Sequence, residues 1–254
     1  MGYPKGREGQ SLANTPLPLE DSKKKNNPEP IGLRYFLPSS NCNQIIHHTY
    51  FSLSYCESHE QAEWVAYKLI PKYFTGVSRT DDYREDPKVR TGSATLEDYR
   101  NSGYDRGHLV PAGSMKHNYS AMSETFYMSN ISPQRQEFNG GMWLNLEEKV
   151  RGWTIKSDSI YVVTGGILRP GLEKIRGTKV SIPQYFYKAI VRFKSGKIDG
   201  IGFVMENKKL SGNVINYAVT IDEIEELTGI DFFTYFPQEI EDRIESELNK
   251  SRWN

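Results

Sequence analysis

The feature of this chain that most constrains its fold is a pair of strand-like segments separated by a short turn. Residues 185–193 and 197–205 have the composition of strands, and Lys194-Ser195-Gly196-Lys197 between them predicts a hairpin. Further strands are predicted at residues 45–55, 159–166 and 214–219. Because strands mostly follow strands, with only a few helices inserted, the predicted fold class is α+β.

Helices are predicted where a capping box precedes apolar residues at helical spacing. One box begins at Ser58 and opens a helix that ends before Pro71. Another begins at Thr220, and its helix ends at Gly229. Residues 237–248 have the pattern of an acidic amphipathic helix on the surface.

The first thirty residues differ in composition from the rest of the chain. Residues 1–30 contain Gly, Pro, Asn and Ser, three lysines at 23–25 and few apolar side chains, so burial cannot offset the entropy of ordering them. We predict a flexible tail or linker over residues 1–30 and a folded domain over residues 31–254. No apolar run approaches the roughly 20 residues that span a bilayer, and the N-terminus lacks the apolar core of an export signal.

The charge balance and the cysteines leave functional questions open. Lys+Arg and Asp+Glu number 32 each, so the formal net charge of zero argues against nucleic-acid binding through bulk positive charge. It does not exclude a local basic groove.

The two cysteines, Cys42 and Cys56, are too few for a zinc site and are compatible with either a disulfide or two free thiols.

Residues 104–151 gather chemically active side chains between glycine-marked turns. Asp105, Arg106 and His108 fall within four residues, around Gly107. Histidine can remove a proton near neutrality because its unperturbed pKa is about 6.5, and glycine permits a close backbone approach or an unusual dihedral angle. A lone histidine after a glycine is more often structural, but the neighbouring residues favour a catalytic role.

A helix predicted from Met142 onwards brings two oxygen donors together. Asn139 lies near its N-terminus, where amides often cap, and Glu147 follows eight residues later. Eight residues are a little over two turns, so both side chains can share one helix face. Their oxygens suit Mg²⁺. Helix capping by Asn139 and a solvated charge at Glu147 are the alternatives.

Phosphodiester cleavage fits the chemistry of this set. The reaction needs a base for water, a cation on the non-bridging oxygen and stabilisation of the leaving alkoxide. His108, a Mg²⁺ at Asn139 and the guanidinium of Arg106 supply these, since a guanidinium binds phosphate oxygens in a fixed fork. The other histidines on a predicted strand, His47 and His48, point to opposite faces, and we expect each to be an ordinary hydrogen-bonded strand residue.

The motifs resemble the signature of the DNA/RNA non-specific endonucleases. Asp105-Arg106-Gly107-His108, Ser129-Asn130-Ile131-Ser132-Pro133-Gln134, Asn139 and Leu146-Glu147 keep the order and spacing of that family, and the similarity runs from about residue 45 to residue 237. The resemblance implies a ββα-metal nuclease fold. In that fold two short strands and a helix carry the site, and a central antiparallel β-sheet flanked by helices braces it.

The resemblance also implies a role for each motif residue. His108 would be the general base. Asn139 would be the direct protein ligand of one Mg²⁺, for which Mn²⁺ or another divalent cation could substitute, and Glu147 would hold metal-bound water. Arg106 would contact phosphate, and Asn130 would orient either His108 or the phosphate.

Further assignments follow from the same resemblance. Gln134 would stiffen the site on the substrate side, and Asp105 would fix the local backbone rather than bind metal. The family uses another arginine upstream, for which Arg79 and Arg84 are the candidates; we favour Arg79. Pairing with nearby carboxylates is the alternative for both arginines.

These residues predict a Mg²⁺-dependent endonuclease acting on single- and double-stranded DNA and RNA and leaving 5′-phosphate and 3′-hydroxyl ends. Little base selectivity is expected, because phosphate and sugar contacts carry little sequence information. The alternatives are an inactive nucleic-acid-binding or interaction protein with a nuclease fold, and a phosphodiesterase for another substrate. Homodimerisation and an inhibitor protein remain open. Because such a nuclease would harm its own cytoplasm, we expect a secreted, periplasmic or surface-exposed location, with any signal or anchor absent from this chain.

Overall fold

The computed structural model describes residues 36–253, so the tail predicted for residues 1–30 lies outside the described part. The strands are β1 (Ile45–His47), β2 (Phe51–Cys56), β3 (Gln61–Leu69), β4 (Asp105–His108), β5 (Ile131–Gln134), β6 (Ser159–Gly166), β7 (Tyr185–Lys194), β8 (Lys197–Glu206) and β9 (Ala218–Val219). The α-helices are α1 (Leu96–Tyr99), α2 (Tyr119–Glu124), α3 (Leu144–Ile155), α4 (Ile221–Thr228) and α5 (Gln238–Ser246). Short 3₁₀ turns are η3 (Pro71–Phe74), η4 (Ala112–Ser114), η5 (Met128–Asn130), η7 (Val214–Tyr217) and η8 (Lys250–Trp253), and η6 (Phe138–Trp143) is a π-helical turn.

One large sheet organises the described residues. Its strands follow the order β1-β2-β3-β6-β7-β8-β9, every neighbouring pair is antiparallel, and β4 pairs with β5 in a separate two-stranded sheet. This arrangement confirms the predicted α+β class with a large antiparallel sheet. Among residues 36–253, no helix is both long and apolar enough to cross a lipid bilayer.

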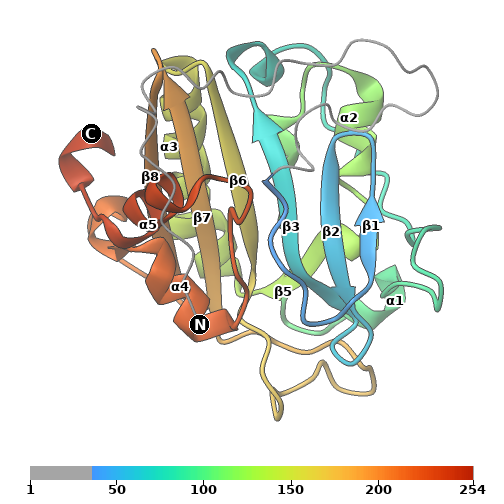
Figure 1. The fold of residues 1–254 in the computed structure, drawn as a ribbon. Coiled ribbons are helices and arrows are strands. Elements are labelled where there is room, and N and C mark those ends of the chain that lie inside the picture. Colours follow the sequence, from blue (N-terminus) through green and yellow to red (C-terminus); the bar gives the residue numbers. More distant parts are fainter. Residues whose placement is uncertain (1–35, 254) are drawn as a thin grey trace, which may run out of the picture.

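Helices cover the two faces of the large sheet at β6–β8. Figure 1 shows α3 behind these strands and α4 and α5 in front of them. Alternation along β7 sends Phe186 and Ile190 into the core shared with α3, and Tyr187 and Val191 into the core shared with α4 and α5. Each fully buried side chain of this size contributes roughly 1.5–3 kcal/mol. The site described below lies on the α3 face.

The predicted β7–β8 hairpin and the helix after Thr220 are confirmed. Ser195 and Gly196 at the tip of the hairpin have φ of 50° and 76°, as a two-residue turn matched to strand twist requires. Thr220 and Glu223 form a reciprocal capping box at the start of α4, and Gly229 ends that helix in the left-handed region at φ 66°. Local signals were sufficient for these elements.

The helix predicted after Ser58 is wrong, because residues 61–69 form the strand β3. This strand lies inside the sheet, between β2 and β6, and nearly all its side chains are buried. A strand covered on both faces loses the alternation of polar and apolar residues that identifies a half-exposed strand. Its apolar residues then fall by chance at helical spacing.

Two other predicted strands have different boundaries. The segment 45–55 is a hairpin of β1 and β2 rather than one strand, because the chain reverses at residues 48–50. In the segment 214–219, η7 takes the first four residues, and Asn213 accepts a hydrogen bond from the Ile215 N–H at its start. Only β9, Ala218–Val219, pairs with the sheet.

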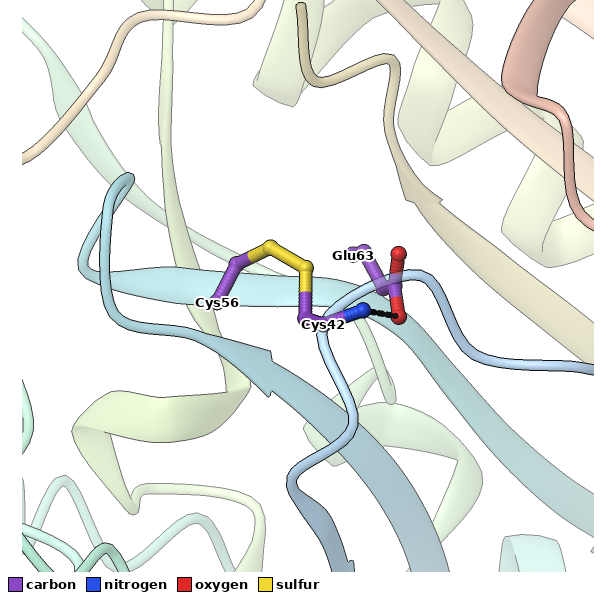
Figure 2. Close-up of side chains that lie close together, drawn as sticks. All are labelled: Cys42, Cys56 and Glu63. Atoms are coloured by element: carbon purple, nitrogen blue, oxygen red, sulfur yellow. Dashed lines mark hydrogen bonds between the residues drawn. A yellow bond between two sulfur atoms is a disulfide. The ribbon is translucent and has the colours of Figure 1, made fainter.

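A disulfide joins the segment before β1 to the end of β2. Cys42 and Cys56 form the bridge, so the structure decides between the two alternatives left open by the sequence. Beside it, one carboxylate oxygen of Glu63 on β3 accepts hydrogen bonds from the N–H groups of Asn41 and Cys42 and from the hydroxyls of Ser40 and Ser54. Figure 2 shows the Cys42 bond to this oxygen. The disulfide and the buried carboxylate together fix residues 40–42 on the sheet.

Candidate active site

The Asp-Arg-Gly-His motif forms a two-stranded sheet with the segment that ends in Gln134. Residues 105–108 make up β4 and pair antiparallel with β5, with Gly107 opposite Ser132. A Cβ atom at Gly107 would lie 2.2 Å from the Gln134 side chain. Gly107 therefore serves a close approach between two strands, one of the two roles expected for it.

The chain then enters α3 through an irregular turn. Residues 138–143 form the π-helical η6, in which Gly141 leaves helical geometry with φ −111° and ψ −116°. No side chain caps this turn, and Asn139 is used elsewhere. The capping alternative for Asn139 is therefore wrong. β4, β5 and α3 together form the ββα unit that carries the site.

A cleft of about 830 Å³ opens over this unit. Its wall includes most of the residues singled out in the sequence: Arg79, Asp105, Arg106, His108, Asn139 and Glu147. Tyr83, Arg100 and Arg151 also line it. Four arginines line the cleft together with three acidic residues, Glu97, Asp105 and Glu147, so its wall has a formal excess of one positive charge on a chain of zero formal net charge.

Asp105 sets the orientation of the Asn139 amide. Asn139 Nδ2 donates to Asp105 Oδ2 at 2.9 Å. Because the NH₂ end of the amide is held by this carboxylate, the carbonyl oxygen Oδ1 is left free as a hard donor. Asp105 thus fixes a side chain and not the backbone, which corrects the sequence-based expectation for it. The free oxygen of Asn139 fits a Mg²⁺-type cation.

His108 is held neutral by its surroundings. It packs against Phe126 and Tyr83, with ring centroids 4.8 and 5.6 Å away. Burial, and next the Arg79 guanidinium, lower the pKa of His108 to about 3, below the ordinary value assumed from the sequence. The ring is hydrogen-bonded to the Arg106 backbone, whereas Nε2 is shielded and has no partner among residues 36–253. The neutral imidazole has a nitrogen lone pair for a proton, and the low pKa makes it a weak base in the substrate-free protein.

A buried lysine lies beneath Glu147. Lys188 of β7 is fully buried; its Nζ donates to Thr164 Oγ1 at 3.1 Å and lies 4.2 Å from the centroid of the Trp143 ring. Burial raises the pKa of Glu147, an effect that the Lys188 charge opposes, and burial lowers the pKa of Lys188. Each charge thus stabilises the other, and Glu147 is more than a solvated helix residue.

The two upstream arginines have different environments. Arg79 lines the cleft, stacks 4.8 Å from the Phe126 ring centroid and bonds to Asp81 and the Tyr83 hydroxyl. Arg84 is not among the cleft residues; it bonds to Asp82 and stacks on Tyr127. Both arginines thus pair with a carboxylate, the alternative expected for them, but Arg79 also lines the cleft; the geometry favours Arg79 over Arg84 as the phosphate ligand, which stays a prediction.

Arg106 and Arg79 share one aromatic partner. The Arg106 guanidinium lies 4.5 Å from the Tyr83 ring centroid and has no ion pair with a carboxylate among the described residues. Its donors are therefore available to an anion in the cleft.

Asn130 and Gln134 support the site from behind. Asn130 is fully buried. Its Oδ1 accepts the Val110 N–H, and its Nδ2 donates to the carbonyls of Val110 and Thr125. A direct contact between Asn130 and phosphate is therefore not supported. Gln134 is also fully buried and packs on Gly107, away from the cleft wall. Both residues can act on the reaction only by positioning β4, and that role remains a prediction.

His47 and His48 are ordinary hydrogen-bonded residues, as expected. His48 Nε2 lies 2.8 Å from Asp86 Oδ2, and His47 Nδ1 lies 2.9 Å from Ser52 Oγ. Neither residue lines the cleft.

Sequence reasoning missed Tyr83, Lys188 and Arg151 as parts of the site. A lysine inside the apolar run Tyr185-Phe186-Tyr187-Lys188-Ala189-Ile190 was the available signal, because a strand interior does not bury a charge without a partner. Tyr83 and Arg151 carried no signal, since they sit in a polar loop and on a helix that is charged along its length.

Together, the ββα unit, its arginine-lined cleft and the large antiparallel sheet behind it define a ββα-metal nuclease fold. The histidine, amide and carboxylate of such a site all lie in that cleft. The chain belongs to the DNA/RNA non-specific endonuclease family, whose model matches residues 32–239. The resemblance inferred from the motifs is thereby confirmed.

Known proteins support the same assignment. The chain is 33% identical over 218 residues to "Nuclease EXOG, mitochondrial" of Danio rerio, which covers 79% of this chain and 63% of that protein. It is 32% identical over 187 residues to "Endonuclease G, mitochondrial" of Homo sapiens, covering 67% of this chain and 63% of that protein. A solved structure described as "Crystal structure of the EndoG/EndoGI complex: Mechanism of EndoG inhibition" matches with a TM-score of 0.73 and 29% identity, covering 82% of this chain and 91% of that chain.

The names of these relatives correct the expected location of the protein. The expected secreted, periplasmic or surface-exposed location is wrong, because the EXOG and endonuclease G relatives are named as mitochondrial nucleases. The chain spans 63% of the length of each of these two relatives.

Proposed function

We propose that this protein is a Mg²⁺-dependent endonuclease that hydrolyses phosphodiester bonds of both DNA and RNA. The observation that carries the proposal is the position of the His108 ring and the Asn139 amide in the wall of one arginine-lined cleft. A base and a hard oxygen donor that share a cleft can act on opposite sides of one scissile phosphate.

The roles of the protein residues follow from their positions. His108 would take a proton from the attacking water at Nε2, the ring nitrogen without a partner. Asn139 Oδ1 would bind the cation directly and Glu147 would hold its water; when bound, the cation offsets charge on the phosphate and on the leaving oxygen. Arg106 and Arg79 would bind the non-bridging oxygens through their guanidinium forks. Cleavage on the 3′-oxygen side of the phosphorus would leave 5′-phosphate and 3′-hydroxyl ends.

The contacts available in the cleft favour a broad substrate range. Its arginines offer donors suited to phosphate, a group that DNA and RNA share. We therefore propose cleavage without strong base preference.

The proposal is tested by digesting a supercoiled plasmid and a folded RNA side by side, in Mg²⁺ and in EDTA. Cleavage of both in Mg²⁺ alone is expected, with 3′ ends that a polymerase extends and 5′ ends that a kinase labels only after phosphatase treatment. Asn139→Ala, with Asn145→Ala on the exposed face of α3 as its control, should lose activity that added Mg²⁺ partly restores. Full activity in EDTA refutes the metal assignment. Binding of plasmid without cleavage would instead identify an inactive nucleic-acid-binding protein.

A further inference from the structure

A second group of carboxylates lies on the face of the sheet opposite the cleft. Asp222 and Glu225 come from α4, and Glu245 comes from the last turn of α5. One oxygen from each residue lies within 4.8 Å of the others. Figure 1 shows α4 and α5 side by side in front of β7 and β8, whereas α3, which contributes Glu147 and Arg151 to the cleft, lies behind.

Glu245 gives this group an unusual property for acidic surface residues. Glu245 is only 6% exposed, and its Oε1 is shielded from solvent and has no hydrogen-bond partner in the part of the chain that the structure describes. A buried oxygen of this kind costs free energy unless a proton or a cation binds to it. The other two carboxylates retain access to solvent, so an ion can enter from their side.

Within the described part of the chain, no ion pair neutralises the group. Among residues 36–253, no Lys, Arg or His forms an ion pair with any of the three carboxylates. Arg243, on the same helix as Glu245, instead donates to the Ile198 carbonyl. Burial, and next the charge of Glu225, raise the pKa of Glu245 to about 9, and burial raises the pKa of Glu225 to about 7. In the ion-free protein Glu245 therefore holds a proton at neutral pH, and a bound cation would take the place of that proton.

The two helices hold these carboxylates in fixed relative positions. A Cβ atom at Gly200 would lie 2.0 Å from the Ile244 carbonyl oxygen, and one at Gly202 would lie 2.6 Å from the Thr220 carbonyl oxygen. Glycines on β8 thus let α4 and α5 sit directly on the strand backbone. Glu225 Oε1 also accepts the Phe232 N–H at 2.7 Å, which orients that carboxylate. Ligands held in this way lose little entropy when an ion binds.

We propose that Asp222, Glu225 and Glu245 form a binding site for a divalent cation of the hard, oxygen-seeking class, with Ca²⁺ as the best fit. Ca²⁺ accepts irregular sets of carboxylate, backbone and water oxygens, whereas Mg²⁺ demands near-octahedral geometry. The ion would join α4 to α5 and stabilise the C-terminal part of the fold.

The test measures thermal unfolding and binding heat, so it is independent of nuclease activity. The protein carries Asn139→Ala to remove the cation ligand of the cleft, and it is titrated with CaCl₂ up to about 10 mM, beyond the affinity range of weak calcium modules. We expect Ca²⁺ to raise Tm and to bind at one site by calorimetry. Adding Glu245→Gln should weaken binding more than about 10-fold, and Glu225→Gln should do the same. Glu239→Gln, an exposed acidic change in the first turn of α5, is the matched control and should leave binding intact.

Three results would overturn the proposal. The first is a Tm that Ca²⁺ does not change while Glu245→Gln alone raises it, since this means that Glu245 simply carries a proton. The second is Ca²⁺ binding that survives both glutamine substitutions. The third is Ca²⁺ binding that the Glu239→Gln control weakens as strongly as Glu245→Gln does, which would indicate diffuse attraction to an acidic surface.

Discussion

Replacing Asp105 by alanine tests how the cleft prepares its cation ligand. In the structure Asp105 Oδ2 accepts the Asn139 Nδ2–H at 2.9 Å, which leaves Oδ1 of this cleft-lining amide available to a cation. A hydrogen bond to a charged group contributes about 1.5–3 kcal/mol, and loss of an outer partner of a metal ligand typically weakens metal binding about 10–100-fold. We therefore expect Asp105→Ala to raise the Mg²⁺ concentration for half-maximal nicking about 10–100-fold. The rate at saturating Mg²⁺ should stay close to wild type, because His108 and Arg106 are unchanged.

The assay is the initial rate of supercoiled plasmid nicking as a function of Mg²⁺ concentration. Asp105→Asn is the matched control: it keeps an oxygen that can accept the same hydrogen bond but removes the charge, so its Mg²⁺ requirement should fall between wild type and Asp105→Ala. An unchanged requirement in Asp105→Ala would refute the orientation argument. Equal impairment in both variants would also refute it, since attraction by the charge alone would then explain the effect.

Three other substitutions address the neighbouring groups. His108→Ala should lower plasmid nicking about 10²–10⁴-fold while calorimetric Mg²⁺ binding is retained; a loss of metal binding as well would contradict its role as a base. Lys188→Met removes the charge that opposes the burial-raised pKa of Glu147, so the carboxyl should be neutral at pH 7; activity should fall there and recover partly as pH rises, and a pH–rate profile matching wild type would exclude the coupling. His108 has a folded-state pKa of about 3, below an unfolded value near 6.5, so the unfolded chain takes up the proton first as pH falls. Between pH 7 and pH 5 the wild type should lose about 2 kcal/mol more unfolding free energy than His108→Asn, measured by urea denaturation; equal losses would show that His108 titrates normally.

Most of the site was readable because its signals are short and local. The Asp105–His108 motif, Asn139 and Glu147 were found from residue type and spacing, and the structure brings all of them to one cleft. A capping box and a glycine defined α4, and a four-residue turn defined the β7–β8 hairpin. In the helix cap, the hairpin turn and the Asp105–His108 motif, the residues that give the signal lie within a few positions of each other in the chain.

The sequence by itself therefore determined the fold class, the family and the set of chemical groups. The tertiary structure alone decided that residues 61–69 are a strand, since both faces of β3 are covered by segments distant in the chain. It alone paired Asp105 with Asn139 and placed Lys188 beneath Glu147. The physical reason is that burial and electrostatic partners are properties of the folded volume: a side chain acquires its pKa and its orientation from neighbours that the order of residues does not name.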